Sequence, residues 1–171
     1  MTIVSYKASI LDVIKILLHR LSLSFPTNEY FMREALKEAS KAFDADEVPI
    51  GAIIVCQEKI IARAYNLTER LNDVTAHAEM QAFTSAANFL GGKYLDECTL
   101  YVTVEPCVMC AGASYWTRVQ KIVFGAHDEK KGFLSQFALS KKILHPKTKL
   151  IGGVLEEECA SLMKEFFRKK R

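Results

Sequence analysis

Two motifs on either side of one strand-like segment constrain this chain more than any other feature. The first, His77-Ala78-Glu79, stands near the start of a segment with helical periodicity, residues 76–90, which Gly91 ends. The second, Pro106-Cys107-Val108-Met109-Cys110, opens another helical segment, because proline lacks the N–H that a first helical turn leaves unpaired. Residues 98–104 (CTLYVTV) lie between the motifs and are rich in strand-forming residues. A single strand between two helices lets both helix N-termini meet at one edge of a sheet, where we expect the two motifs.

The residue types in these motifs are those of a catalytic metal site. Cys107 and Cys110 are three residues apart and lie on one helix face, where the positive end of the helix dipole favours thiolates. With His77 they form three nitrogen and sulfur ligands, which suits zinc and leaves a fourth position for water. Zinc lowers the pKa of its bound water from about 15.7 to about 7, and Glu79 is the carboxylate available to carry protons. The motifs alone leave two alternatives: a redox-active cysteine pair, and a closed structural site with Glu79 as fourth ligand.

The rest of the chain predicts an α/β protein. At 171 residues it is long enough for one domain with a full hydrophobic core. The expected elements are, in chain order, a helix from residue 27 or 28, strands at 51–56 and 59–65, the two motif helices around the strand at 98–104, strands at 121–125 and 150–154, and a closing amphipathic helix at 155–171. This order indicates helices that cover a sheet of about five strands.

Residues 1–26 have an amphipathic helical pattern that ends at Pro26, and we interpret them as an N-terminal extension to a domain at residues 27–171. No stretch approaches the roughly 18 consecutive apolar residues of a membrane span. The most apolar N-terminal run, residues 10–23, lacks a secretory cleavage site. Cys56, Cys98 and Cys159 stand alone, as buried thiols in a reducing compartment do. We therefore expect a cytoplasmic protein without a membrane segment.

Charge is distributed unevenly along the chain. Residues 117–171 carry 13 Lys and Arg against 6 Asp and Glu, whereas the preceding residues are acidic on balance. A basic C-terminal third attracts a polyanionic partner, although a solvated basic face has the same composition.

Five stretches of the sequence resemble the cytidine deaminase-like superfamily, and within it the bacterial tRNA-specific adenosine deaminases. They are VPIGAIIV at 48–55, Asn66, DVTAHAEM at 73–80, TLYVTVEPCVMCAGA at 99–113, and IVFGAHD at 122–128. The resemblance implies a three-layer α/β/α fold, a homodimer, and zinc-dependent conversion of adenosine to inosine at the wobble position of a tRNA anticodon stem-loop. It further implies that His77, Cys107 and Cys110 hold zinc and that Glu79 shuttles protons. It also implies that Asn66 and Asp128 contact the target nucleoside.

Some residues depart from that pattern and keep two other functions open. Tyr115-Trp116 is similar to the corresponding pair of bacterial guanine deaminases, which act on the free base, although Val108 stands where those enzymes typically have proline. Residues 132–135 and the segment around His145 also differ from the family in a region expected to touch RNA. A zinc-stabilised RNA-binding module without turnover is the other alternative, and the presence of Glu79 argues against it.

Overall fold

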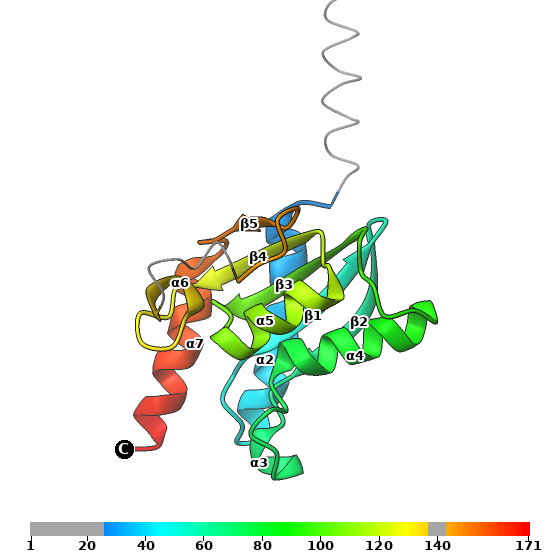
Figure 1. The fold of residues 1–171 in the computed structure, drawn as a ribbon. Coiled ribbons are helices and arrows are strands. Elements are labelled where there is room, and N and C mark those ends of the chain that lie inside the picture. Colours follow the sequence, from blue (N-terminus) through cyan, green and yellow to red (C-terminus); the bar gives the residue numbers. More distant parts are fainter. Residues whose placement is uncertain (1–25, 137–142) are drawn as a thin grey trace, which may run out of the picture.

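The computed structural model describes residues 26–136 and 143–171 (Figure 1). The helical pattern expected within residues 1–26 lies, apart from Pro26, outside the described residues. The helices are α2 (Asn28–Asp44), α3 (Thr68–Leu71), α4 (Ala78–Leu90), α5 (Val108–Thr117), α6 (Phe133–Gln136) and α7 (Glu156–Lys169). The strands are β1 (Gly51–Cys56), β2 (Lys59–Tyr65), β3 (Cys98–Val104), β4 (Lys121–Ala126) and β5 (Lys149–Ile151).

The strands form one mixed sheet of five in the order β2-β1-β3-β4-β5. β1 runs antiparallel to both β2 and β3, whereas β3, β4 and β5 run parallel. At the start of β1, Gly51 pairs with Tyr65 at the end of β2, and Ala52 pairs with Val102 near the end of β3. The C-terminal ends of β2, β3 and β4 therefore meet at one edge of the sheet.

Alternate residues of the central strands face two apolar clusters, which makes the fold three layers thick. On one side, Ile53 of β1 packs in a cluster with Met32 of α2 and Cys159 of α7. On the other side, Ile54 belongs to a cluster with Phe83 of α4 and residues of α5. Figure 1 shows α4 and α5 in front of the sheet and α2 behind it. The expected α/β/α architecture with a sheet of about five strands is confirmed.

Local sequence signals account for several helix ends. Thr27 caps α2, because its Oγ1 accepts a hydrogen bond of 3.2 Å from the backbone N–H of Tyr30. Gly91 ends α4 with φ 64°, a left-handed conformation that costs glycine little. Three features were not predicted: the short helix α3 within the polar stretch after β2, the short helix α6 after β4, and the shortness of β5, which covers three residues.

The start of α5 differs from the sequence-based prediction. We expected Pro106 to be the first helical residue, but Cys107 is the N-cap and the helix begins at Val108. The reason is that the Pro106 carbonyl accepts a hydrogen bond of 3.0 Å from Phe133 N, so the first helical hydrogen bond ends instead on Cys107 O. Among the described residues, no helix has the length and apolar character needed to cross a membrane.

Candidate active site

Three loops carry the expected site residues to the edge where β2, β3 and β4 end. Asn66 follows β2 directly, Cys107 comes three residues after β3, and Asp128 comes two residues after β4. A backbone hydrogen bond of 3.0 Å from Leu67 N to Ala76 O returns the chain to this edge just before α4 begins. The topology thus gathers residues that are up to 62 positions apart in the sequence.

His77, Cys107 and Cys110 come together as a three-ligand cluster. His77 Nδ1 lies 3.6 Å from Cys107 Sγ and 3.5 Å from Cys110 Sγ, and the ligand atoms of all three residues lie within 4.8 Å of one another. His77 is the N-cap of α4 and Cys107 is the N-cap of α5, yet neither side chain caps its helix. Both side chains are therefore free to bind a cation between the two helix N-termini, and this group can hold a metal ion.

The pKa values of the two thiols are shifted in opposite directions. A hydrogen bond from Cys110 lowers the pKa of the Cys107 thiol to about 4, although burial opposes this. The same hydrogen bond, together with burial, raises the pKa of Cys110. A bound divalent cation keeps both sulfurs deprotonated, because its own charge is the largest in the site. The donor set of one imidazole and two thiolates fits zinc.

Glu79 lies in the first turn of α4, two residues after His77, with a side chain that is almost fully buried. Its Oε2 is the buried side-chain atom that lacks a hydrogen-bond partner within the part of the chain that the structure describes. Burial raises the pKa of this carboxyl, the nearby Cys107 charge raises it further, and a hydrogen bond with Cys110 lowers it. Since an unsatisfied buried carboxylate oxygen is costly, Oε2 is suited to interact with a group bound at the cluster.

Asn66 is held by a second buried carboxylate, Glu47. The Asn66 side chain is 3% exposed, and its Nδ2 donates to Glu47 Oε2 (3.1 Å) and to Thr68 Oγ1 (2.9 Å). Its backbone N–H donates to Ile50 O at 3.0 Å, so both the backbone and the side chain of this residue are restrained.

Asp128 organises the loop that follows β4. Its Oδ1 accepts hydrogen bonds of 3.0 Å from the backbone N–H groups of Lys130 and Lys131. No hydrogen bond to its Oδ2 occurs among residues 26–136 and 143–171, so this oxygen is available to a ligand. The loop lies against the cluster, because Gly132 forms a β-bridge with Cys107.

Glu105 holds the same loop in place by hydrogen bonds. Its fully buried carboxylate accepts hydrogen bonds from Leu134 N (2.8 Å, to Oε1) and pairs with His127 Nδ1 (3.2 Å, to Oε2). Sequence reasoning singled out neither Glu105 nor Glu47. The signal that could have found Glu105 is a carboxylate placed directly after a fully buried strand, where it must have partners.

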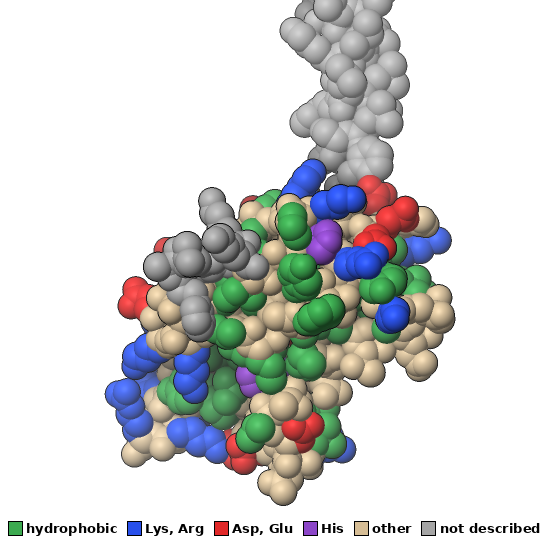
Figure 2. Space-filling view, in the orientation of Figure 1, with side chains coloured by type: hydrophobic (Ala, Val, Ile, Leu, Met, Phe, Trp, Pro, Cys, Tyr) green, Lys and Arg blue, Asp and Glu red, His purple; other side chains and the backbone are tan. Residues whose placement is uncertain are grey.

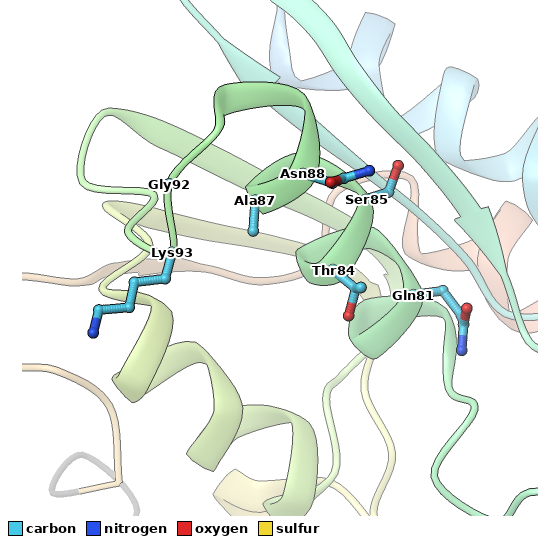
Figure 3. Close-up of a pocket in the computed structure, with 7 residues that line it drawn as sticks. All are labelled: Gln81, Thr84, Ser85, Ala87, Asn88, Gly92 and Lys93. Atoms are coloured by element: carbon cyan, nitrogen blue, oxygen red, sulfur yellow. The ribbon is translucent and has the colours of Figure 1, made fainter.

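One surface depression lies away from this cluster (Figure 3). It has a volume of about 560 Å³ and is lined by polar side chains of α4, among them Gln81, Thr84 and Asn88, and by Lys93 of the following loop. None of the clustered metal-ligand residues lines it. Its lining residues include no histidine, cysteine or carboxylate.

A His/Cys/Cys group beside a buried glutamate on a layered α/β sheet defines the class of the nucleobase deaminases. More particularly, the chain belongs to the MafB19-like deaminase family, whose family model matches residues 27–171.

Individual relatives agree with this membership. The chain is 47% identical to the tRNA-specific adenosine deaminase of Bacillus subtilis (strain 168) over 146 residues, which cover 84% of this chain and 91% of the relative. A solved structure from a study of A-to-I editing by tRNA:A34 deaminases superposes with a TM-score of 0.72 at 41% identity, over 78% of this chain and 98% of that one. A guanine deaminase structure from Bacillus subtilis matches less of the fold, with a TM-score of 0.57 at 40% identity over 59% of this chain and 65% of that one. The resemblance inferred from the sequence is confirmed.

Proposed function

We propose that this protein catalyses the zinc-dependent hydrolysis of adenosine to inosine at the wobble position of a tRNA anticodon, with release of ammonia. The observation that carries the reaction is the buried, unpartnered Oε2 of Glu79 beside the three-ligand cluster. Support for the substrate comes from relatives named as tRNA-specific adenosine deaminases, to which most of the chain aligns. We assign the catalytic domain to residues 27–171 and regard residues 1–26 as an extension to it.

His77, Cys107 and Cys110 would hold the zinc ion, which supplies a water of lowered pKa when bound. Glu79 would carry two protons in turn, the first from that water to the purine ring nitrogen and the second from the hydroxyl added to the ring carbon to the departing amine. The position of Glu79 suits this role, because burial raises the pKa of its carboxyl and so makes it a better proton acceptor.

Asn66 and Asp128 would contact the target nucleoside from loops on two sides of the cluster. Each carries a side chain that is restrained by hydrogen bonds within the protein, which lowers the entropy lost on binding. A base must leave its stack to enter such a site, and an anticodon loop makes this inexpensive because its bases are unpaired.

The surface suits an RNA partner. Figure 2 shows Lys and Arg side chains at the lower left, around α7. Four consecutive basic residues, 168–171, span the last turn of α7 and the two residues after it. Positive charge here would bind phosphates and make affinity salt-dependent.

We further propose a cytoplasmic homodimer whose interface includes Trp116, because this side chain is 78% exposed at the end of α5.

A second candidate function is guanine deamination on the free base. The edge-to-face pair of Tyr115 and Trp116, with ring centroids 5.6 Å apart, and the similarity to a guanine deaminase structure favour it.

The experiment that separates these functions is a substrate panel with zinc-loaded protein. Ammonia release would be measured with a stem-loop that has adenosine at the wobble position, and with free guanine, adenosine and cytidine. We expect ammonia from the stem-loop and none from the free compounds. Turnover of guanine alone would establish the second candidate, and zinc-loaded protein that is inert toward the whole panel would refute deamination.

A further inference from the structure

We propose that Glu47 is a positioning residue for substrate recognition, which acts by fixing the amide of Asn66 in one of its two orientations. The inference rests on the proposed function, in which Asn66 contacts the nucleoside. Glu47 lies in the connection between α2 and β1, and its side chain is 1% exposed. It is therefore a buried carboxylate that faces the loop after β2 rather than solvent.

Glu47 accepts hydrogen bonds at both carboxylate oxygens. Oε2 receives Asn66 Nδ2 (3.1 Å), Thr68 Oγ1 (3.3 Å) and Glu69 N (3.2 Å), and Oε1 receives Arg70 N (2.8 Å). Four donors thus converge on one carboxylate, and both of its oxygens are occupied as acceptors. The carboxylate also supplies the cap that α3 lacks, since Leu67 at its N-cap makes no side-chain hydrogen bond.

This arrangement leaves the Asn66 amide a single orientation. Both N–H bonds of its Nδ2 point at acceptors, Glu47 Oε2 and Thr68 Oγ1. A flipped amide would place the Asn66 carbonyl oxygen against the Glu47 carboxylate, where two acceptors repel each other. Without Glu47 the amide could present its nitrogen and its oxygen in turn to the same substrate atom. A recognition group that alternates between donor and acceptor discriminates poorly between substrates, because one of its two orientations leaves a buried polar group unpaired.

Glutamine cannot replace Glu47 in this role. Since both carboxylate oxygens receive donors, the amide nitrogen of Glu47→Gln would meet a donor in either orientation. Glu38→Gln is the matched control. Glu38 is a carboxylate of similar burial, 3% exposed, but its partners are Lys41 and Arg63.

The experiment is a double-mutant cycle in kcat/KM for the anticodon stem-loop, with zinc content measured for every variant. We expect Glu47→Gln to lose about 10- to 100-fold in kcat/KM, as outer-shell partners of site residues do, with zinc content unchanged. Because Glu47 acts through Asn66, the double variant should be within about twofold of Asn66→Ala alone. Glu38→Gln should retain wild-type kcat/KM. Independent, multiplicative losses in the double variant would overturn the proposal, as would a Glu47→Gln variant of wild-type activity.

A measurement without substrate keeps this test separate from the proposed function. The side-chain NH₂ signals of Asn66 in an NMR spectrum can be assigned by their absence in Asn66→Ala. We expect slow hydrogen exchange of these protons in the wild type and in Glu38→Gln, and faster exchange in Glu47→Gln. Unchanged exchange in Glu47→Gln would refute the pairing. An inactive wild type with the expected exchange pattern would refute the proposed function and leave the pairing of Glu47 with Asn66 established.

Discussion

Replacement of Glu79 by glutamine should make the metal-free protein more stable and the zinc-loaded protein nearly inactive. Glu79 is 3% exposed and its Oε2 has no hydrogen-bond partner in the described part of the chain. An unsatisfied buried polar group costs about 1–3 kcal/mol, and more when it is charged. Glutamine keeps the shape and leaves a neutral polar group that cannot ionise, so the cost of burying a charge disappears and we expect the free energy of unfolding at neutral pH to rise by about 1–3 kcal/mol. For a chain of this size, each 1 kcal/mol raises Tm by roughly 2–4 °C.

The assay is thermal unfolding by circular dichroism in the presence of a chelator, with Glu38→Gln as a control of opposite sign. Glu38 is equally buried but paired with Lys41 at 2.7 Å and Arg63 at 3.4 Å. Because both partners are largely exposed, loss of these pairs should lower stability by up to about 1 kcal/mol. In the zinc-loaded proteins, Glu79→Gln should lower kcat by at least about 10²–10⁴-fold at equal zinc content, the contribution of a general acid–base group.

The reasoning about Glu79 would be refuted by a Glu79→Gln variant that is less stable than the wild type without metal. Joint loss of zinc and stability would instead make Glu79 a metal ligand, and the site a closed structural one.

Other consequences follow from the same structure. Cys110→Ala should lose bound zinc and unfold at lower temperature, because metal binding energy is also folding energy. Cys159 is a buried thiol on the sheet-facing side of α7, and Cys159→Ala should keep its zinc; equal zinc content in both variants would contradict the ligand assignment. Hydrogen bonds from Lys37 and Arg63 lower the pKa of Glu34. The pairing of Glu34 therefore stabilises the fold above the unfolded-state pKa of about 4.3. This stabilisation is lost as the pH falls through the lower folded-state pKa. The stability difference between wild type and Glu34→Gln should therefore shrink between about pH 5 and pH 3, and a difference that stays constant in chemical denaturation would contradict the pairing. Stem-loop affinity should fall with a linear slope in log[salt], and a flat titration would argue against phosphate contacts.

The parts of the site that were predictable from sequence are those whose spacing is local. The pair Cys107 and Cys110 on one helix turn, and His77 two residues before Glu79, can be read from sequence separation alone, and the structure brings the three ligands together. The meeting of the two helix N-termini at one edge of the sheet also follows from the sequence, because only β3 lies between α4 and α5. The start of α5 was misplaced at Pro106, since its carbonyl pairs with a residue 27 positions later, which no local pattern reports.

Contacts between distant segments could not be predicted in the same way. Glu47 meets Asn66 across 19 residues, and Glu105 meets Leu134 across 29 residues. A lone Glu in a loop is ordinarily solvated. The burial of Glu47 and of Glu105 becomes evident only once β1 is paired with β2 and β3 with β4. Glu47 caps the helix α3 through Glu69 N and Arg70 N, a long-range contact that no local sequence pattern reports.

The proposed substrate is a single adenosine in the anticodon loop of a tRNA. The most direct test is to locate inosine along the tRNA sequence after treatment with the protein. A full-length tRNA with adenosine at the wobble position would be treated with zinc-loaded protein, and inosine would be read as adenosine-to-guanosine changes after reverse transcription and sequencing. We expect the adenosine-to-guanosine change at the wobble position alone. The other adenosines of the same tRNA should stay unchanged, and Glu79→Gln should produce no change at any position. Inosine spread over several loop adenosines, or an unchanged tRNA beside rapid consumption of free guanine, would contradict the proposed function.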